Sequence, residues 1–528
     1  MNSKFNEDLS FQFKLATIEQ VSNGINNLKS NAQGSDQISA LMLKYCSPVI
    51  SKHVTHIVNC CLELGYFPEC WKLSLIKPLP KTKKPATYGD LRPVSILPAL
   101  SKVLERIIYN QLYEYVVNNG IINSLQSGFR KGHSTTTVLL NIVDDIFRST
   151  DLGKATLLIL LDFSKAFDTL DHSLLCAKLY YHGLDEVSLS FFKNYLSGRF
   201  QRVFVEGGVS DFVRITSGVP QGSILGPLLF LIYTADIFNC VSHSSVQAFA
   251  DDTQIIYSFE PAFTEQACVS VNEDLRAIEQ YAENNNLKLN AAKCSMLIFC
   301  PKKHRLSMEE NVQLFINQTR LQPVKTAKNL GLIIDTKVRF SEHVSMVINK
   351  CYAVLKPLYT NISIINFKLR KKLCESFILP KINYANIVYF PCLDTLTLIR
   401  LQRMINTCCR FVCRLKKFDH ISERLTQLKW FKIRRSYEYH LSVFVHRLLQ
   451  TSSPSYLRHK LKYRLNVHDL DLRYTHRLAL PRFHTAKFKN SFSYNAPTIY
   501  NEISDDIKRM SLDSFRKKIK HMIFQRSQ

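Results

Sequence analysis

An uninterrupted apolar run that ends in an acid is the feature that most constrains how this chain can fold. Residues 155–161 read ATLLILL, and Asp162 follows directly. Such a short continuous run is typical of a buried strand. A carboxylate at the end of that strand is costly unless water, a partner group or a metal ion solvates it. The segment therefore predicts a buried strand that presents a carboxylate at its end.

A second acidic pair stands between apolar residues, in the segment SVQAFADDTQIIYSF (245–259). Its pattern predicts two short strands joined by a tight turn at Asp251 and Asp252. Two adjacent carboxylates repel each other, so a bound cation is a natural way to keep both ionised. An Asp-Asp pair by itself is more often a solvated turn, and the pair alone therefore does not identify a site.

The other apolar patterns predict a mixed α+β protein of two to four domains, as expected for 528 residues. Helical spacing covers 16–28, 41–65 and 100–117, and a β-hairpin is expected over 74–97. A strand, a Gly-Gly turn and a second strand follow residue 202, before a helix in LGPLLFLIYTADIF. The chain is predicted to be mostly helical past residue 340, and the fold after about residue 420 is left unassigned.

Positive charge is concentrated in the last third of the chain. The formal net charge is +26, and 35 of the 69 Lys and Arg residues, but only 12 of the 43 Asp and Glu residues, lie after residue 340. A solvated helical surface explains many isolated charge runs, but not an excess of this size. We interpret this region as a phosphate-contacting surface, with nucleic acid as the expected partner and an acidic membrane surface as the weaker alternative.

The cysteines and the apolar runs bear on the cellular compartment. The 15 cysteines are odd in number and scattered, and the first twenty residues lack the apolar stretch of a secretory signal. The apolar run at 226–233 is too short to span a bilayer. We therefore expect a reduced, intracellular protein of the nucleus and cytoplasm that is not secreted and has no membrane partner. Cys409, Cys413 and His420 are expected to be structural residues, because no second ligand pair has zinc-site spacing.

An ordered series of motifs runs through the first two thirds of the chain. The motifs are IKPLPK (76–81), LRPVSIL (91–97), QSGFRKGHST (126–135), DFSKAFD (162–168), SGVPQGSILGP (217–227), FADD (249–252), LKLNAAK (287–293) and NLGLIID (329–335). Over about residues 20–345 this series resembles the motifs of reverse transcriptases, specifically those of jockey-like non-LTR retrotransposons. The resemblance continues more weakly to the end of the chain. No segment resembles an endonuclease, so the chain looks like the polymerase and tail of such an element, or a host copy of it.

The resemblance implies a right-hand polymerase fold followed by a basic, mainly helical C-terminal region. The implied domains are an N-terminal helical extension (1–70), fingers and a palm with an antiparallel sheet (71–340), a basic helical thumb (341–420) and a basic region of unknown fold (421–528).

The resemblance also assigns roles to individual residues. Two Mg²⁺ ions, for which Mn²⁺ can substitute, would be held by Asp162, Asp251, Asp252 and the backbone carbonyl of Phe163. Lys293 would protonate the departing pyrophosphate. The residues expected to contact the dNTP are Lys81, Arg92, Phe167, Gln221 and Gly222, and those expected to form the primer grip are Leu330 and Gly331. Ordinary explanations stay open for three of these residues: a core aromatic for Phe167, a surface loop lysine for Lys81 and a solvated side chain for Lys293.

The implied function is RNA-directed DNA polymerisation, in which dNTPs are added to a primer 3′-hydroxyl on an RNA template. The implied partners are an RNA template, a DNA primer, dNTPs and a separate endonuclease. The main alternative is a catalytically silent nucleic-acid-binding relic or a host-domesticated copy. Intact acids at 162, 251 and 252 argue against a relic. The segment YTADIF (233–238) departs from the usual Asn-Asp of the family, although Asp236 keeps the acid.

Overall fold

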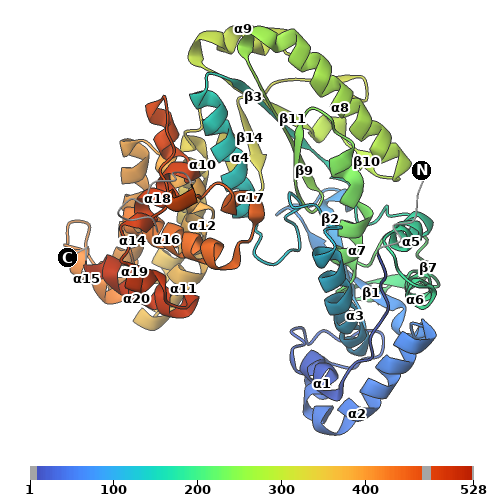
Figure 1. Ribbon diagram of the computed structural model, residues 1–528. Helices are drawn as coiled ribbons and strands as arrows, with labels where there is room; N and C mark the ends of the chain where they lie inside the picture. The colour runs from blue at the N-terminus through green and yellow to red at the C-terminus, as the bar shows by residue number, and fades with distance from the viewer. Residues whose placement is uncertain (1–8, 467–476, 526–528) are drawn as a thin grey trace. The chain divides into compact units, whose positions relative to one another are not determined.

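The chain folds into two compact units whose segments alternate along the sequence. The structure is a computed structural model that describes residues 9–466 and 477–525. Unit 1 comprises the residues up to 129, together with 162–242 and 274–290, and the rest of the chain forms unit 2. Figure 1 colours the ribbon along the chain and labels the helices and strands. Each unit therefore builds its core from segments that are distant in the sequence.

Unit 1 contains the first three long helices. Thr17 caps α1 (Ile18–Asn26), and Ser39 caps α2 (Ala40–Leu64), in each case by accepting a hydrogen bond from a backbone N–H in the first turn. The third helix, α3 (Ala99–Asn118), packs against α1, which also contacts α2. These three helices confirm the helical spacing found in the sequence.

The sheet of unit 1 has the strand order β2-β1-β5-β6. Strands β1 (Leu73–Pro80) and β2 (Leu91–Ile96) form the predicted antiparallel hairpin. Strand β5 (Phe200–Val205) joins β1 in parallel, and it pairs in antiparallel fashion with the short β6 (Gly208–Val209) and β7 (Val213–Arg214). The Gly-Gly turn expected from the sequence lies between β5 and β6. The other elements of unit 1 include β4 (Phe163–Ser164), α5 (His172–Tyr181), α6 (Glu186–Leu196), α7 (Gly226–Tyr233) and β10 (Lys288–Leu289).

The sheet of unit 2 has four antiparallel strands in the order β11-β3-β9-β8. Strand β3 (Ala155–Leu161) is the apolar run of the sequence, and its central residues are fully buried. Strands β8 (Ser245–Phe249) and β9 (Asp252–Phe259) form the predicted pair around the two acids, and β11 (Ser295–Phe299) lies on the other side of β3. Helix α4 (Thr135–Asp151) packs against β3 and β8.

Unit 2 continues with two hairpins and a long series of helices. The first hairpin pairs β12 (Leu314–Ile316) with β13 (Thr319–Leu321), and the second pairs β14 (Thr326–Asn329) with β15 (Leu332–Asp335). The helices after residue 340 are α10 (Ser341–Thr360), α11 (Phe367–Phe377), α12 (Leu379–Asn383), α13 (Asn386–Tyr389), α14 (Thr395–Cys413), α15 (Ser422–Leu428), α16 (Ile433–Thr451), α17 (Ser455–Arg458), α18 (Phe492–Asn501), α19 (Asp505–Lys508) and α20 (Leu512–Gln525). The mostly helical character predicted for this part is confirmed, and the residues described after 420 are also mostly helical.

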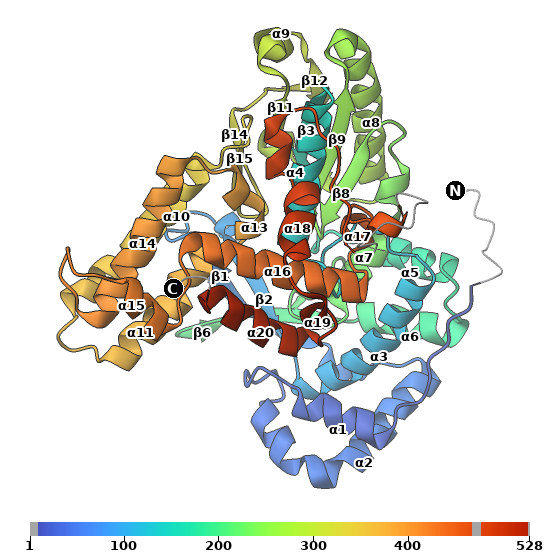
Figure 2. The same ribbon diagram turned by 60° about the vertical axis from the view of Figure 1, so that its left-hand side comes forward.

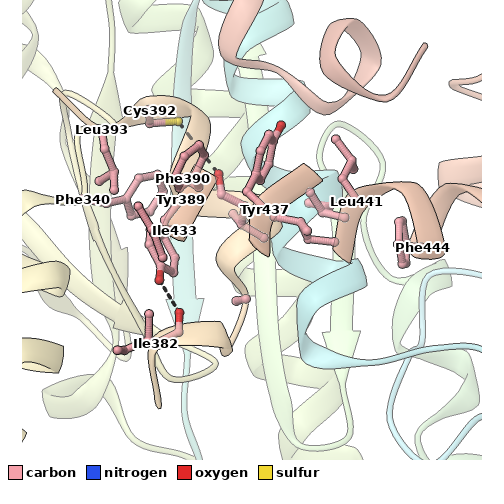
Figure 3. Packing of buried hydrophobic residues seen from close by; sticks show 14 of the residues in the cluster. Phe340, Ile382, Tyr389, Phe390, Cys392, Leu393, Ile433, Tyr437, Leu441 and Phe444 are labelled. Carbon is pink, nitrogen blue, oxygen red and sulfur yellow. Dashed lines mark hydrogen bonds between the residues drawn. The ribbon is translucent and has the colours of Figure 1, made fainter. Parts of the chain in front are cut away.

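These helices share one apolar core rather than forming separate ones. Figure 3 shows part of it, where Phe390 stacks on Tyr437 with ring centroids 4.6 Å apart. Phe340 and Tyr389 are buried in the same cluster, which extends through α16 and α18 to α20. An offset aromatic stack contributes about 0.5–1.5 kcal/mol beyond the burial of its rings. The C-terminal helices are therefore part of the packing of unit 2.

Polar contacts also tie the C-terminal segment to α4. Asp144 of α4 is completely buried and accepts hydrogen bonds from the backbone N–H and the hydroxyl of Ser493, both at 2.7 Å. Lys460 Nζ lies 3.0 Å from Asp144 Oδ2 and 2.5 Å from Asp145 Oδ1. Figure 2 shows α17 and α18 beside α4. Buried carboxylates need such partners, so α4 depends on residues more than three hundred positions away.

The α+β class predicted from the sequence is confirmed, whereas the four-domain division stays a prediction. The structure groups 130–161 and 243–273 with the residues from 291 on, because their strands and helices share a core. Within residues 9–466 and 477–525, no helix combines the length and the apolar character needed to cross a membrane.

Candidate active site

The turn between β8 and β9 presents the two adjacent acids at the end of the sheet of unit 2. Phe249 pairs with Asp252, so only Ala250 and Asp251 form the connection. Ala250 adopts a left-handed φ of 57°, which is strained for a residue with a Cβ atom. Such strain costs about 1–3 kcal/mol and persists where the surrounding structure enforces it. Asp251 is half-buried and Asp252 is exposed.

The third acid follows the neighbouring strand. Leu161, the last residue of β3, pairs with Thr253 near the start of β9. Asp162 comes one peptide bond later, so its Cα atom lies about 3.8 Å from that of Leu161. Its carbonyl oxygen accepts a hydrogen bond from the backbone N–H of Asn290 at 2.9 Å. Within unit 2, the register thus sets the end of β3, at Leu161, beside the start of β9, and Asp162 is the next residue in the chain.

Side chains alone do not form a ready-made metal cage. Among the residues that the structure describes, no three His, Cys, Asp or Glu side chains are gathered closely enough to hold a metal ion. Phe163, whose carbonyl was assigned to the metal, is buried and pairs with Leu289 of β10. The metal-binding roles of Asp162, Phe163, Asp251 and Asp252 therefore stay predictions.

In unit 1, two loops that carry predicted substrate-binding residues lie against each other. The backbone N–H of Val219 donates to the carbonyl of Phe167 at 3.0 Å, and Gln221 Nε2 donates to Asp168 Oδ1 at 2.8 Å. Gly218 has a φ of 79°, and a Cβ atom there would lie 2.7 Å from the backbone of Asp168. Glycine is required at this point because no side chain fits. The structure thus brings the loops of Phe167 and Gln221 together, and their contacts with a dNTP stay predictions.

The ring of Phe167 is held by two other aromatic rings. It stacks on Phe230 of α7 with centroids 4.4 Å apart and meets the edge of Phe129 at 6.0 Å. Its side chain remains partly exposed. Phe167 therefore differs from an ordinary core phenylalanine in its partial exposure, and packing against Phe230 and Phe129 fixes the orientation of its ring.

The loop that carries Gln221 is anchored by two residues that the sequence analysis did not single out. The N–H of Ser95 donates to the Gln221 carbonyl at 2.8 Å. The buried Glu105 accepts hydrogen bonds from the N–H groups of Ile224 and Leu225, at 2.6 and 3.2 Å, just before α7 begins. Burial raises the pKa of Glu105, although nearby cations and these N–H groups oppose the rise. An acid on the apolar face of VLERII was the available signal for Glu105.

Gly222 lies in the same loop and closes tightly on β2. Its φ is 139°, and a Cβ atom on Gly222 would lie 2.4 Å from the carbonyl oxygen of Ser95. The two predicted phosphate-contacting cations belong to the hairpin of β1 and β2. Arg92 is exposed and pairs with Leu79, and the exposed Lys81 donates from Nζ to the carbonyl of Gly89 at 2.9 Å. Both cations are therefore on the surface of the hairpin, and their roles stay predictions.

The predicted primer grip is a tight hairpin in unit 2. Leu330 and Gly331 form the turn between β14 and β15, with φ values of 44° and 85°. The hydroxyl of Tyr384 donates to the Leu330 carbonyl at 2.5 Å and lies 2.9 Å from Thr135 Oγ1. Tyr384, which follows α12, thus holds the hairpin in place. No local sequence pattern indicated this contact.

Lys293 and Asp236 are two further positions that the sequence analysis singled out. Lys293 ends a short 3₁₀ turn before β11 and is exposed, so its role as a proton donor stays a prediction. Asp236, in the segment that departs from the family pattern, lies 2.9 Å from Nζ of the buried Lys178 and accepts a hydrogen bond from the Tyr281 hydroxyl. The acid at position 236 therefore serves the packing of unit 1.

Comparisons with known proteins agree with the motif series. Residues 79–334 match the family model described as "Reverse transcriptase (RNA-dependent DNA polymerase)". The "Probable RNA-directed DNA polymerase from transposon X-element" of Drosophila melanogaster is 30% identical over 324 residues, which cover 60% of this chain and 34% of that protein. The "RNA-directed DNA polymerase from mobile element jockey" of the same species is 30% identical over 348 residues, which cover 64% of this chain and 37% of that protein.

A third relative, the "Probable RNA-directed DNA polymerase from transposon BS" of Drosophila melanogaster, is 28% identical over 366 residues, which cover 66% of this chain and 39% of that protein. The chain therefore spans between a third and two fifths of the length of these curated relatives.

Proposed function

Because residues 79–334 form a reverse-transcriptase domain related to those of the jockey, X-element and BS non-LTR retrotransposons, we propose that the protein is an RNA-directed DNA polymerase. In this proposal the 3′-hydroxyl of a primer attacks the α-phosphate of a dNTP, and pyrophosphate leaves. The observation that supports the proposal is the register of β3 and β9, in which Leu161, the residue before Asp162, pairs with Thr253, the residue after Asp252.

Carboxylate oxygens are the ligands that Mg²⁺ prefers, so the chemistry of these three acids fits the metal that the family requires. Asp162, Asp251 and Asp252 would hold two Mg²⁺ ions, with the Phe163 carbonyl as a further ligand and Mn²⁺ as a substitute. When bound, such ions stabilise the charge on the attacking and departing oxygens. The half-burial of Asp251 and the exposure of Asp252 leave this end of the sheet accessible to metal and substrate.

The residues of unit 1 would position the nucleotide. Arg92 and Lys81 would contact its phosphates, because guanidinium and ammonium groups pair strongly with phosphate oxygens. Phe167 would exclude a 2′-hydroxyl by its bulk, and its stacking on Phe230 would keep the ring in place. Gln221 would contact the nucleotide or the template, with its amide orientation set by Asp168.

The finer architecture belongs to the same proposal. The β1–β2 hairpin would belong to the fingers, the β11-β3-β9-β8 sheet would be the palm, and the helices over 341–420 would be the thumb. The β14–β15 turn at Leu330 and Gly331 would be the primer grip, and Lys293 would donate a proton to pyrophosphate. The basic residues after 340 would contact the phosphates of the duplex, so binding should weaken steeply with added salt.

We propose as partners an RNA template, a DNA primer, dNTPs and a separate endonuclease, and no membrane. We also propose that the protein works in the nucleus and cytoplasm and is not secreted. An odd number of cysteines, scattered along the chain, supports a reducing compartment.

Primer extension tests the proposed function directly. Purified protein is incubated with poly(rA)/oligo(dT), labelled dTTP and Mg²⁺, and the products are resolved by length. We expect incorporation that stops when a chelator removes the metal and resumes with Mg²⁺ or Mn²⁺. No incorporation with either metal, from protein that still binds the template and primer, would identify a catalytically silent nucleic-acid-binding relic instead.

A further inference from the structure

A polar groove lies between α1 and α3 in unit 1. It has a volume of about 620 Å³, within the usual range for ligand sites. Figure 2 shows α1 next to α3, and the two helices are in contact. Gly222 and Ile224, from the loop that carries Gln221, also contribute to the lining of the groove.

The lining of this groove has one sign of charge. Three cations, Lys29, Lys102 and Arg106, contribute to it, and none of its described lining residues is an acid. Unit 1 as a whole is not strongly basic in sequence, because the excess positive charge lies after residue 340. A concave surface with only positive charge attracts polyanions, since clefts focus the field of the charges that line them.

The groove also repeats its polar groups along its length. Lys102, Arg106 and Asn110 are spaced four residues apart on α3, so they form a row with a rise of about 6 Å between neighbours. The lining also includes the amides of Asn23 on α1 and of Asn27, the residue that follows α1. Amides donate and accept hydrogen bonds, as base edges and ribose hydroxyls require. A groove lined by both cations and amides suits a linear polymer of phosphates and bases.

The dimensions favour one strand over a duplex. Packed helices have axes about 8–10 Å apart, so a groove between two of them is too narrow for a double helix. Gly222 in the lining directly follows Gln221, which the proposed function places at the nucleotide or template. We propose that the α1–α3 groove binds the single-stranded, still uncopied part of the template as it leads toward the Gln221 loop.

This inference rests on the proposed function for the identity of the strand, but not for the binding itself. Binding is therefore measured without catalysis, by fluorescence anisotropy. The probes are a blunt RNA–DNA duplex and the same duplex with a single-stranded template extension of about ten nucleotides. We expect the wild-type protein to bind the extended duplex more tightly than the blunt one. The ratio of the two affinities measures how much the groove contributes to binding of the single-stranded extension.

The variant Lys29→Ala/Arg106→Ala removes two exposed cations of the groove and leaves Lys102 in place beside Glu105. We expect it to lose most of the affinity gained from the extension and to bind the blunt duplex as before. For the extended duplex, the slope of log affinity against log salt concentration should become less steep by about 1.4, because each lost phosphate contact to a single strand removes about 0.7 from its magnitude. The control Lys44→Ala/Lys52→Ala removes the same charge from α2, outside the lining, and should behave as the wild type.

A near-isosteric change guards against misfolding. Asn110→Asp keeps the size of the side chain but places a negative charge in the row on α3, and it should also reduce the gain from the extension. The inference is overturned if the double variant and Asn110→Asp keep the wild-type gain, or if the α2 control loses as much as the groove variant. Extension-dependent binding in a protein that fails to extend primers would refute the polymerase but not the groove.

Discussion

The ion pairs between Lys460 and helix α4 provide a sharp test of how the C-terminal region supports the sheet. The Lys460 ammonium reaches Asp144 and Asp145, and its side chain is only 12% exposed. Asp144 is completely buried, whereas the side chain of Asp145 is 39% exposed. The perturbation is Lys460→Met, which keeps a long flexible side chain and removes the charge.

The magnitude follows from the burial of each carboxylate. Removing one partner of a buried ion pair costs about 3–5 kcal/mol, because the other charge is left uncompensated. Asp144 keeps its two hydrogen bonds from Ser493, which favours the lower end of that range. The more exposed pair with Asp145 adds about 0–1 kcal/mol, because water screens it. We therefore expect Lys460→Met to lower the free energy of unfolding of unit 2 by about 3 kcal/mol.

The two tryptophans allow unit 2 to be measured by itself. Trp71 lies in unit 1 and the buried Trp430 in unit 2, so a Trp71→Phe background leaves a single fluorescence probe in unit 2. Urea unfolding of this background is compared with and without Lys460→Met. The neighbouring Lys462→Met, at an exposed position, is the matched control and should change little.

A second substitution separates charge from packing. Asp144→Asn added to Lys460→Met removes the uncompensated charge, while the Asn side chain can still accept a hydrogen bond from Ser493. The double variant should therefore be more stable than Lys460→Met alone. A loss below about 1 kcal/mol for Lys460→Met, the size of a surface pair, would refute the claim that the C-terminal region holds α4 through this charge.

Three other predictions follow from single positions. Burial raises the pKa of Asp151, but hydrogen bonds led by the Thr485 hydroxyl outweigh it and hold the pKa below its ordinary value. The stability that Asp151 adds should be present at neutral pH and lost as the pH falls through this lowered pKa, so the gap between wild type and Asp151→Asn in urea unfolding should close in acid. Gly218→Ala should destabilise the loop by at least about 1 kcal/mol and lower kcat/KM in primer extension, because its Cβ atom would collide with the backbone of Asp168; unchanged kinetics would show that the loop tolerates a shift. Phe167→Ala should admit rNTPs in competition assays against dNTPs, and unchanged sugar selectivity would make Phe167 a packing residue only.

Local structure near the acids could be predicted because each element has a local pattern. The apolar run of β3, the alternation around Asp251 and Asp252 and the turn at Leu330 and Gly331 all require only short-range information. The motif series added the order in which these elements occur. This combination was sufficient to predict the strands and turns that carry the candidate residues.

The contacts that brace these elements could not be predicted in the same way. Tyr384 donates a hydrogen bond to the turn at Leu330, and Glu105 accepts hydrogen bonds from the loop before α7. Both contacts join residues that lie far apart in the sequence. Nothing in the immediate sequence of Tyr384 or Glu105 identifies the partner, since tertiary packing selects it. The division into units was equally hidden, because strand β3 and the helices after residue 340 share a core only after folding.

The central claim is that Asp162 and the Asp251–Asp252 turn act together in nucleotide addition. Single-turnover incorporation of one dNTP is measured for the wild type, Asp162→Asn and Asp251→Asn, with Asp211→Asn at an exposed position as the control. We expect both site variants to lose incorporation while their affinity for the RNA–DNA duplex and their thermal stability stay close to those of the wild type and the control. Incorporation at the wild-type rate by either site variant would contradict the account.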